Sequence, residues 1–148
     1  MNGDKTYKVM IIDDDKFLLN MYSIKFSNNK FDVTTASDGQ AAINKLKEGY
    51  EPDVILLDVV MPVMDGIETL SAIRSQGLAK KAAIMMLSNQ GQPTDIEKAK
   101  QYNVDGYIVK ATVIPSEIVT EVHNLLERTK SRREGAVQGV DTNNLQTN

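Results

Sequence analysis

The sequence predicts an α/β fold built on a doubly wound, parallel β-sheet. Short apolar runs alternate five times with longer amphipathic stretches, which is the pattern of repeated β-α-β units. The expected strands lie near residues 8–12, 31–36, 53–58, 82–87 and 106–109. Four of these runs are continuously apolar, as in strands that helices cover on both faces, whereas the second run alternates between apolar and polar side chains. We therefore expect the second strand to lie nearer an edge of the sheet.

Each expected strand is followed by a stretch that favours a helix. The helices are expected at about residues 15–28, 38–48, 65–76, 94–102 and 115–131. Gly49 and Gly77 are suited to end the second and third helices, because glycine adopts a positive φ without steric cost. Thr94 and Glu97 have the spacing of a capping box at the start of the fourth helix. Pro115 fits the first position of the last helix.

Two of the expected helices differ in how much apolar surface they offer to the core. Ile118, Val122, Leu125 and Leu126 form a stripe along one side of the last helix, which predicts that this side faces the sheet. The fourth helix offers only Ile96 as a large aliphatic side chain. Little apolar burial holds the fourth helix, and we expect it to be the most mobile of the five.

The composition fits one folded domain followed by a polar tail. The chain has 148 residues, of which 41% are hydrophobic and 25% are charged, as in an ordinary globular protein. We expect residues 7–131 to form the domain and residues 1–6 to form an N-terminal extension. Residues 132–148 are mostly small and polar, which favours a disordered tail.

Several classes of function are disfavoured by the composition. A net charge of −3 and a pI near 5.2 give no general electrostatic basis for direct binding of nucleic acid. The N-terminus lacks an apolar signal core, and no apolar run approaches the roughly 20 residues that span a membrane, so a cytoplasmic location is expected. The absence of cysteine excludes disulfides and thiolate chemistry. The single histidine, His123, is expected on the solvated side of the last helix.

Acidic side chains follow two of the expected strands. Asp13 and Asp14 come directly after the first strand, and Asp58 ends the third. The carboxyl ends of the strands in an open parallel sheet meet at one crevice, so these carboxylates are expected to lie close together. Each pair of charges about 4 Å apart repels by roughly 4 kcal/mol at an effective dielectric near 20. Oxygen ligands suit a hard cation, and Mg²⁺ is the expected occupant.

The same edge of the sheet is predicted to carry the other groups that phosphoryl transfer needs. Ser88 ends the fourth strand and Lys110 follows the fifth, which adds a hydroxyl and an ammonium. A phosphoryl group in transfer carries negative charge on three oxygens, and a metal, Lys110 and Ser88 can share that charge. Asp58 is then the nucleophile, and its attack on phosphorus gives an acyl phosphate.

The chain resembles the receiver domain of bacterial two-component response regulators over residues 7 to about 130. The resemblance rests on motifs in matching order and spacing, which are Asp13-Asp14, the run from Leu57 to Gly66 around Asp58, Ser88, Tyr107 and Lys110. It implies a flavodoxin-like (βα)5 fold whose five parallel strands have the order 2-1-3-4-5. It also implies a Mg²⁺ site in which Asp14, Asp58 and the carbonyl of Val60 bind the ion directly and Asp13 acts mostly through water.

The resemblance implies partners as well. A histidine kinase or a histidine phosphotransfer protein would supply the phosphoryl group to Asp58, and Ser88 and Tyr107 would report the phosphorylation state. A downstream protein would bind the face made by the fourth helix, fifth strand and fifth helix. The chain is thus expected to be a stand-alone, chemotaxis-type regulator, monomeric or dimeric on phosphorylation. It is expected to assist its own phosphorylation and dephosphorylation rather than to act as an enzyme on other molecules.

The sequence departs from the family pattern after the lysine. The family usually has proline there with a cis bond, whereas Lys110 is followed by Ala111. A non-proline cis bond costs about 2.5–4 kcal/mol. We nevertheless expect a cis bond between Lys110 and Ala111, because the fifth strand fixes Lys110 and the chain must turn sharply after it. The loop up to Pro115 is about one residue longer than usual, and Asn89 is bulkier than the small residue typical after the switch serine.

Other interpretations of these acidic residues were weighed. A binding module of the same fold would leave Asp58 unmodified. A phosphatase of the haloacid dehalogenase type needs a second aspartate two residues after the nucleophile, where this chain has Val60. A flavin-binding protein needs a phosphate-binding loop after the first strand, and none is present in the sequence. Asp15, Asp38 and Asp65 each precede an expected helix and are interpreted as helix caps.

Overall fold

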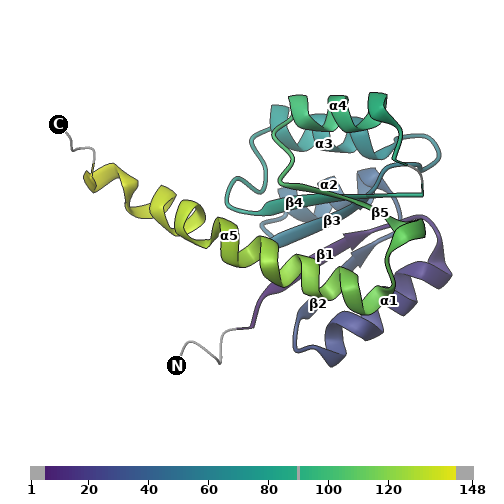
Figure 1. Cartoon of the computed structure of the whole chain (residues 1–148). Coiled ribbons are helices and arrows are strands. Elements are labelled where there is room, and N and C mark those ends of the chain that lie inside the picture. The colour runs from purple at the N-terminus through teal and green to yellow at the C-terminus, as the bar shows by residue number, and fades with distance from the viewer. Residues whose placement is uncertain (1–5, 90, 143–148) are drawn as a thin grey trace.

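The computed structural model describes residues 6–89 and 91–142, and these form the predicted flavodoxin-like α/β fold. Five parallel strands make one sheet of order β2-β1-β3-β4-β5 (Figure 1). The strands are β1 (Lys8–Ile12), β2 (Asp32–Ala36), β3 (Val54–Asp58), β4 (Ala83–Ser88) and β5 (Gly106–Val109). The helices are α1 (Lys16–Asn28), α2 (Gly39–Lys47), α3 (Gly66–Ser75), α4 (Pro93–Gln101) and α5 (Pro115–Thr142), with a 3₁₀ turn η2 (Lys110–Thr112) after β5. The rest of the predicted extension and tail, residues 1–5 and 143–148, lies outside the described residues.

The helices cover the sheet on both faces and so divide the core into two layers. Helices α1 and α5 pack on one face, and α2, α3 and α4 pack on the other (Figure 1). The central strands β1, β3 and β4 are almost completely buried, as their continuous apolar runs predicted. Strand β2 lies at an edge and is only partly buried, as its alternating pattern predicted. No helix in the described ranges is long and apolar enough to cross a membrane.

Side-chain caps fix the starts of the first three helices. The carboxylate of Asp15 accepts hydrogen bonds from two backbone amides of α1, and that of Asp38 accepts one from α2. Asp65 and Glu68 form a complete capping box at the start of α3. The interpretation of Asp15, Asp38 and Asp65 as helix caps is therefore confirmed. Each cap sets where the chain leaves the carboxyl edge of the sheet and enters a helix.

The predicted capping box of the fourth helix is wrong. Helix α4 begins at Pro93, one residue before the predicted start at Thr94, and its N-cap Gln92 makes no side-chain capping hydrogen bond. Proline is suited to the first helical position, because its missing N–H is not needed there and its φ is already helical. Of the residues in α4 only Ala99 is buried. The expected weak apolar anchoring of this helix is present in the structure.

Helix α5 continues past its predicted end. Residues 132–142 are helical, where the sequence predicted a disordered tail. The guanidinium of Arg133 ties this part of the helix to the preceding turns and to the base of the sheet. Its Nε donates to the hydroxyl of Thr129 at 3.0 Å and its Nη2 donates to the carbonyl of Leu126 at 3.0 Å. Its Nη1 lies 3.9 Å from the carboxylate of Asp53, at the start of β3.

Gly66 lies where α3 passes close to the end of β3. A Cβ atom at this position would lie within 3 Å of three backbone atoms, the carbonyl oxygen and carbon of Asp58 and the Cα of Val59. The amide of Gly66 also donates to the carbonyl of Val59 at 2.7 Å. A side chain here would push α3 away from the strand that carries Asp58. Glycine is therefore required by close backbone approach.

We predict that Gly66→Ala destabilises the protein by about 2–3 kcal/mol, because the methyl group meets backbone that has no room to move. Gly91→Ala is the matched control, since its Cβ would meet only the Val109 Cγ2 methyl, at 3.0 Å. A side-chain methyl can shift, so this control is expected to cost less than about 1 kcal/mol. Urea unfolding measures both values. Equal costs at the two glycines would contradict the backbone-contact argument.

Candidate functional site

Four strands bring the predicted site residues to one edge of the sheet. Asp58 and Ser88 are the last residues of β3 and β4, Asp13 follows β1, and Lys110 follows β5. Asp13, Asp58 and Ser88 are all buried. Because the strands are parallel and in register, their carboxyl ends converge, as the sequence analysis expected.

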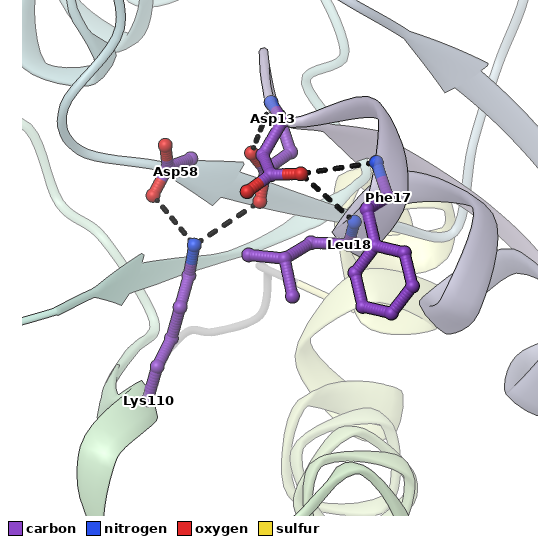
Figure 2. A network of polar contacts seen from close by, with 6 residues as sticks. Asp13, Phe17, Leu18, Asp58 and Lys110 are labelled. Carbon is purple, nitrogen blue, oxygen red and sulfur yellow. Dashed lines mark hydrogen bonds and ion pairs between the residues drawn. The ribbon is translucent and has the colours of Figure 1, made fainter.

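The ammonium of Lys110 joins the two buried carboxylates. Its Nζ lies 3.1 Å from Oδ2 of Asp13 and 3.0 Å from Oδ1 of Asp58. Figure 2 shows the lysine side chain extended from the turn after β5 to a point between the two aspartates. Each of the three side chains is less than 10% exposed. Water therefore screens these ion pairs much less than it would at the surface.

Asp14 completes a group of three carboxylates. Oxygen atoms of Asp13, Asp14 and Asp58 lie within 4.8 Å of one another, and Asp14 is exposed whereas the other two are buried. Three carboxylates carry three negative charges, and Lys110 offsets only one of them. An all-oxygen donor set with excess negative charge fits a hard divalent cation such as Mg²⁺.

The pKa values of Asp58 and Lys110 are both raised in this cluster. Burial, together with the nearby carboxylate of Asp13, raises the pKa of Asp58 from 3.8 to about 6, against the opposing effect of Lys110. Burial acts to lower the pKa of Lys110, but the carboxylates of Asp58 and Asp13 outweigh it and raise that pKa above its ordinary value. The lysine therefore stays charged at neutral pH. Asp58 is held in a place where its charge is disfavoured unless a cation or a covalent bond neutralises it.

The backbone after Lys110 is not cis, which corrects the expectation from the sequence. No cis peptide bond occurs in the described part of the chain. The chain turns instead through η2, where the hydroxyl of Thr112 donates to the carbonyl of Val109 at 2.9 Å. The amide of Ile114 then donates to Oε1 of Glu117 at the start of α5. The turn is made with trans bonds throughout, so the energetic cost of a non-proline cis bond is avoided.

The two residues expected to respond to phosphorylation lie on adjacent strands. Ser88 ends β4 opposite Val109, and Tyr107 lies opposite Met86 in the same ladder. The ring of Tyr107 packs against the core layer below α4. Its hydroxyl is buried and, among the described residues, has no hydrogen-bond partner. A buried hydroxyl without a partner costs about 1–3 kcal/mol, so this position of the ring is not strongly favoured.

Sequence reasoning missed one contact that orients the site. The amide of Asp15 donates to Oδ1 of Asp13 at 2.9 Å, while the Asp15 carboxylate caps α1 by accepting from the amides of Phe17 and Leu18. The start of α1 thereby holds Asp13 with its other oxygen toward Lys110. The run of three consecutive aspartates was the available signal, because only the first two are needed for the site.

Comparison with known families decides what this arrangement is. A model of the response regulator receiver domain matches residues 9–123. The chain belongs to this family. Receiver domains are phosphoacceptors of two-component signalling, and histidine kinases are their partners. The acidic cluster around Asp58 and the adjacent Lys110 have the composition and placement that this family uses.

Individual relatives agree with this assignment. The chain is 34% identical over 110 residues to the chemotaxis protein CheY of Halobacterium salinarum, which covers 74% of this chain and 88% of that protein. It is 32% identical over 123 residues to the alkaline phosphatase synthesis transcriptional regulatory protein PhoP of Bacillus subtilis, covering 83% of this chain but only 50% of PhoP. The solved structure of CheY4 from Vibrio cholerae gives a TM-score of 0.76 at 31% identity, over 82% of this chain and 100% of that one. The chain thus spans about half of the transcriptional regulator and most of the chemotaxis proteins.

We predict that the metal-free protein loses stability as the pH rises from 4 to 7. The raised pKa of Asp58 means that its protonated form favours the folded state, so this contribution is fully present below about pH 4 and is lost as the pH rises through about 6. Asp58→Asn removes the loss and raises the free energy of unfolding at pH 7.5 by about 3 kcal/mol. Urea unfolding in EDTA measures this. Asp32→Asn, which neutralises an exposed carboxylate on β2, should change little, and an equal gain there would exclude local crowding as the cause.

Proposed function

We propose that Asp58 accepts a phosphoryl group from the phosphohistidine of a histidine kinase or of a phosphotransfer protein. The observation that carries this proposal is the contact of 3.0 Å between the Lys110 ammonium and a buried Asp58 carboxylate, inside a cluster of three acidic groups. In the transfer, an Asp58 oxygen forms a bond to phosphorus as the bond from phosphorus to the histidine nitrogen breaks. The electron pair of that broken bond remains on the imidazole. Lys110 stabilises the negative charge on the phosphoryl oxygens.

Asp13, Asp14 and Asp58, together with the carbonyl of Val60, are the groups that would hold Mg²⁺. When bound, the ion would neutralise charge on the carboxylates and on the phosphoryl oxygens. Asp13 also keeps Lys110 in place at 3.1 Å, and the Asp15 amide keeps Asp13 in place. These contacts preorganise the site, so that little rearrangement is needed when a phosphodonor arrives.

Phosphorylation is proposed to act on the rest of the molecule through Ser88 and Tyr107. The Ser88 hydroxyl would donate to a phosphoryl oxygen, which draws the end of β4 toward Asp58. Tyr107 is the neighbour most sensitive to such a movement, because its buried hydroxyl has no hydrogen-bond partner within residues 6–89 and 91–142. Helix α4, which buries only Ala99, offers little resistance to a shift. The face made by α4, β5 and α5 would then present a changed surface to a downstream protein.

Incubation with Mg²⁺ and acetyl phosphate should add one phosphoryl group to the protein. We expect intact-mass measurement to show this single addition in wild type and its loss in Asp58→Asn. A label that resists hydroxylamine, or equal labelling of Asp58→Asn, would place the group on another residue, because hydroxylamine cleaves acyl phosphates and leaves phosphate esters intact. An unmodified wild-type protein would indicate a binding module that does not accept a phosphoryl group.

Lys110→Ala should separate metal binding from signalling. Removing the ammonium takes away the competing cation, so Mg²⁺ binding measured by calorimetry is expected to be retained or tightened. The amide-exchange changes that phosphorylation produces in residues 88–110 are expected to be mostly lost, because no cation links the phosphoryl group to β5. Lys98→Ala, which removes an exposed lysine of α4, serves as the control. A normal exchange response in Lys110→Ala would show that this lysine plays no part in the switch.

A further inference from the structure

The backbone that carries Lys110 lies outside the sheet. Strand β5 ends at Val109, which lies opposite Ser88 at the end of β4, and Lys110 is the first residue of the turn η2. The ladder of backbone hydrogen bonds that fixes the strands therefore stops one residue before the lysine. The position of the Lys110 Cα atom depends instead on how the turn after β5 is held.

The ammonium of Lys110 tolerates little displacement of this backbone. Its Nζ lies 3.1 Å from a carboxylate oxygen of Asp13 and 3.0 Å from one of Asp58. The lysine side chain is already extended to reach this place (Figure 2). An extended side chain has no slack, so a shift of its Cα atom away from the site draws the ammonium away by a similar distance. A displacement of about 1 Å is enough to slow a reaction that depends on positioning.

The side chain of Thr112 closes the turn across the lysine. Its hydroxyl donates to the carbonyl of Val109 at 2.9 Å, so this hydrogen bond spans Lys110 and Ala111. The backbone bond of the same turn, from the amide of Val113 to the carbonyl of Lys110, is 3.4 Å long. That length lies beyond the usual range of about 2.7–3.2 Å for such bonds. The Thr112 hydroxyl is therefore the better formed of these two contacts.

The far end of the turn is fixed by other bonds. The amide of Ile114 donates to Oε1 of Glu117 at 2.8 Å, and the amide of Glu117 donates to the carbonyl of Ile114 at 2.9 Å. These bonds tie the end of the turn to the start of α5, whereas Val109 ties its beginning to the sheet. Between these two fixed ends, the hydroxyl of Thr112 binds back to the strand.

We propose that Thr112 is a positioning residue for phosphoryl transfer and that it acts through Lys110. Its hydroxyl keeps the turn after β5 closed, and the closed turn keeps the lysine ammonium at the two buried carboxylates. This inference rests on the proposed function, because phosphoryl oxygens are the charge that Lys110 would stabilise. Thr112 itself is exposed, and its effect on the reaction passes through the backbone of the lysine.

A purely structural role for Thr112 is the alternative. A hydroxyl with that role would add to the free energy of unfolding without affecting the place of the ammonium. Thr120 is the matched control, because it is also exposed and its hydroxyl donates to the carbonyl of Ser116 at 3.2 Å within α5. Thr120→Val thus removes the same kind of hydrogen bond from a part of the chain that does not carry the lysine.

The first measurement follows the ammonium itself by NMR in isotopically labelled protein without Mg²⁺. The Nζ signal of Lys110 is identified by its absence in Lys110→Ala. Because the side chain is only 9% exposed, its ammonium protons should exchange slowly with water and give a resolved signal. We expect Thr112→Val to shift or broaden this signal, whereas Thr112→Ser, which keeps a hydroxyl, and Thr120→Val should match wild type. An unchanged signal in Thr112→Val, or no slowly exchanging ammonium in wild type, would overturn the proposal.

The second measurement follows labelling by Mg²⁺ and acetyl phosphate, a donor too small for docking of a protein to enter. We expect Thr112→Val to be labelled about fivefold more slowly than wild type, as for the loss of one ordinary hydrogen bond. Thr112→Ser should keep the wild-type rate, as should Thr120→Val. Mg²⁺ binding measured by calorimetry should be retained in Thr112→Val, because the three carboxylates are still in place.

Lys110→Ala decides whether Thr112 acts through the lysine. In that background the hydroxyl has no ammonium to position, so adding Thr112→Val should slow labelling no further. Equal slowing in both backgrounds, a normal rate in Thr112→Val, or an equal loss in Thr120→Val would overturn the proposal. Failure of acetyl phosphate to label wild type would instead remove the proposed function, and the ammonium signal would still test the positioning by Thr112.

Discussion

Three carboxylates and one ammonium share a small volume at the carboxyl edge of the sheet, and much of the surrounding structure serves to hold them there. The strand order places β1 beside β3, which brings Asp13 next to Asp58. Lys110 comes from β5, two strands away from β3 and so about 10 Å distant at a spacing of roughly 4.8 Å per strand. Only a long side chain crosses that distance. The lysine that offsets the acidic charge therefore also ties together strands that share no hydrogen bonds.

The site carries more negative than positive charge, because three carboxylates face one ammonium. Burial and repulsion from Asp13 disfavour the Asp58 carboxylate, and the single ammonium does not compensate fully, as the raised pKa shows. Any event that adds a cation or alters the charge on Asp58 therefore changes the balance of forces among four strands. The loops at this edge, rather than the core, are the parts with freedom to respond.

Much of the fold and of the charge cluster was predictable, because both depend on local patterns and one topological rule. Continuous apolar runs marked buried strands, and the convergence of parallel strand ends brought Asp13, Asp58, Ser88 and Lys110 together. Other features depend on contacts between distant residues. Arg133 connects α5 to Asp53, a contact that no periodicity reveals. The prediction of a cis bond after Lys110 was wrong because it rested on the usual proline pattern, whereas Ala111 turns with a trans bond inside η2.

The β3–α3 loop shows why residue type alone does not reveal backbone strain. Gly66 has an ordinary φ and is required by the closeness of the Asp58 carbonyl, while Val63, three residues earlier, takes the conformation that glycine favours. A reader of the sequence would assign the special backbone geometry to the glycine.

Helix α5 is much longer than the strands that it packs against. At 1.5 Å per residue its 28 residues are about 42 Å long, whereas a strand of five residues spans only about 17 Å. The helix therefore overhangs the sheet (Figure 1). Beyond Arg133 the overhang is about 14 Å, so a tilt of roughly 10° at the sheet displaces its far end by about 2 Å. A small rotation of α5 at the base of the domain would therefore produce a larger displacement at the far end of the helix than at the sheet.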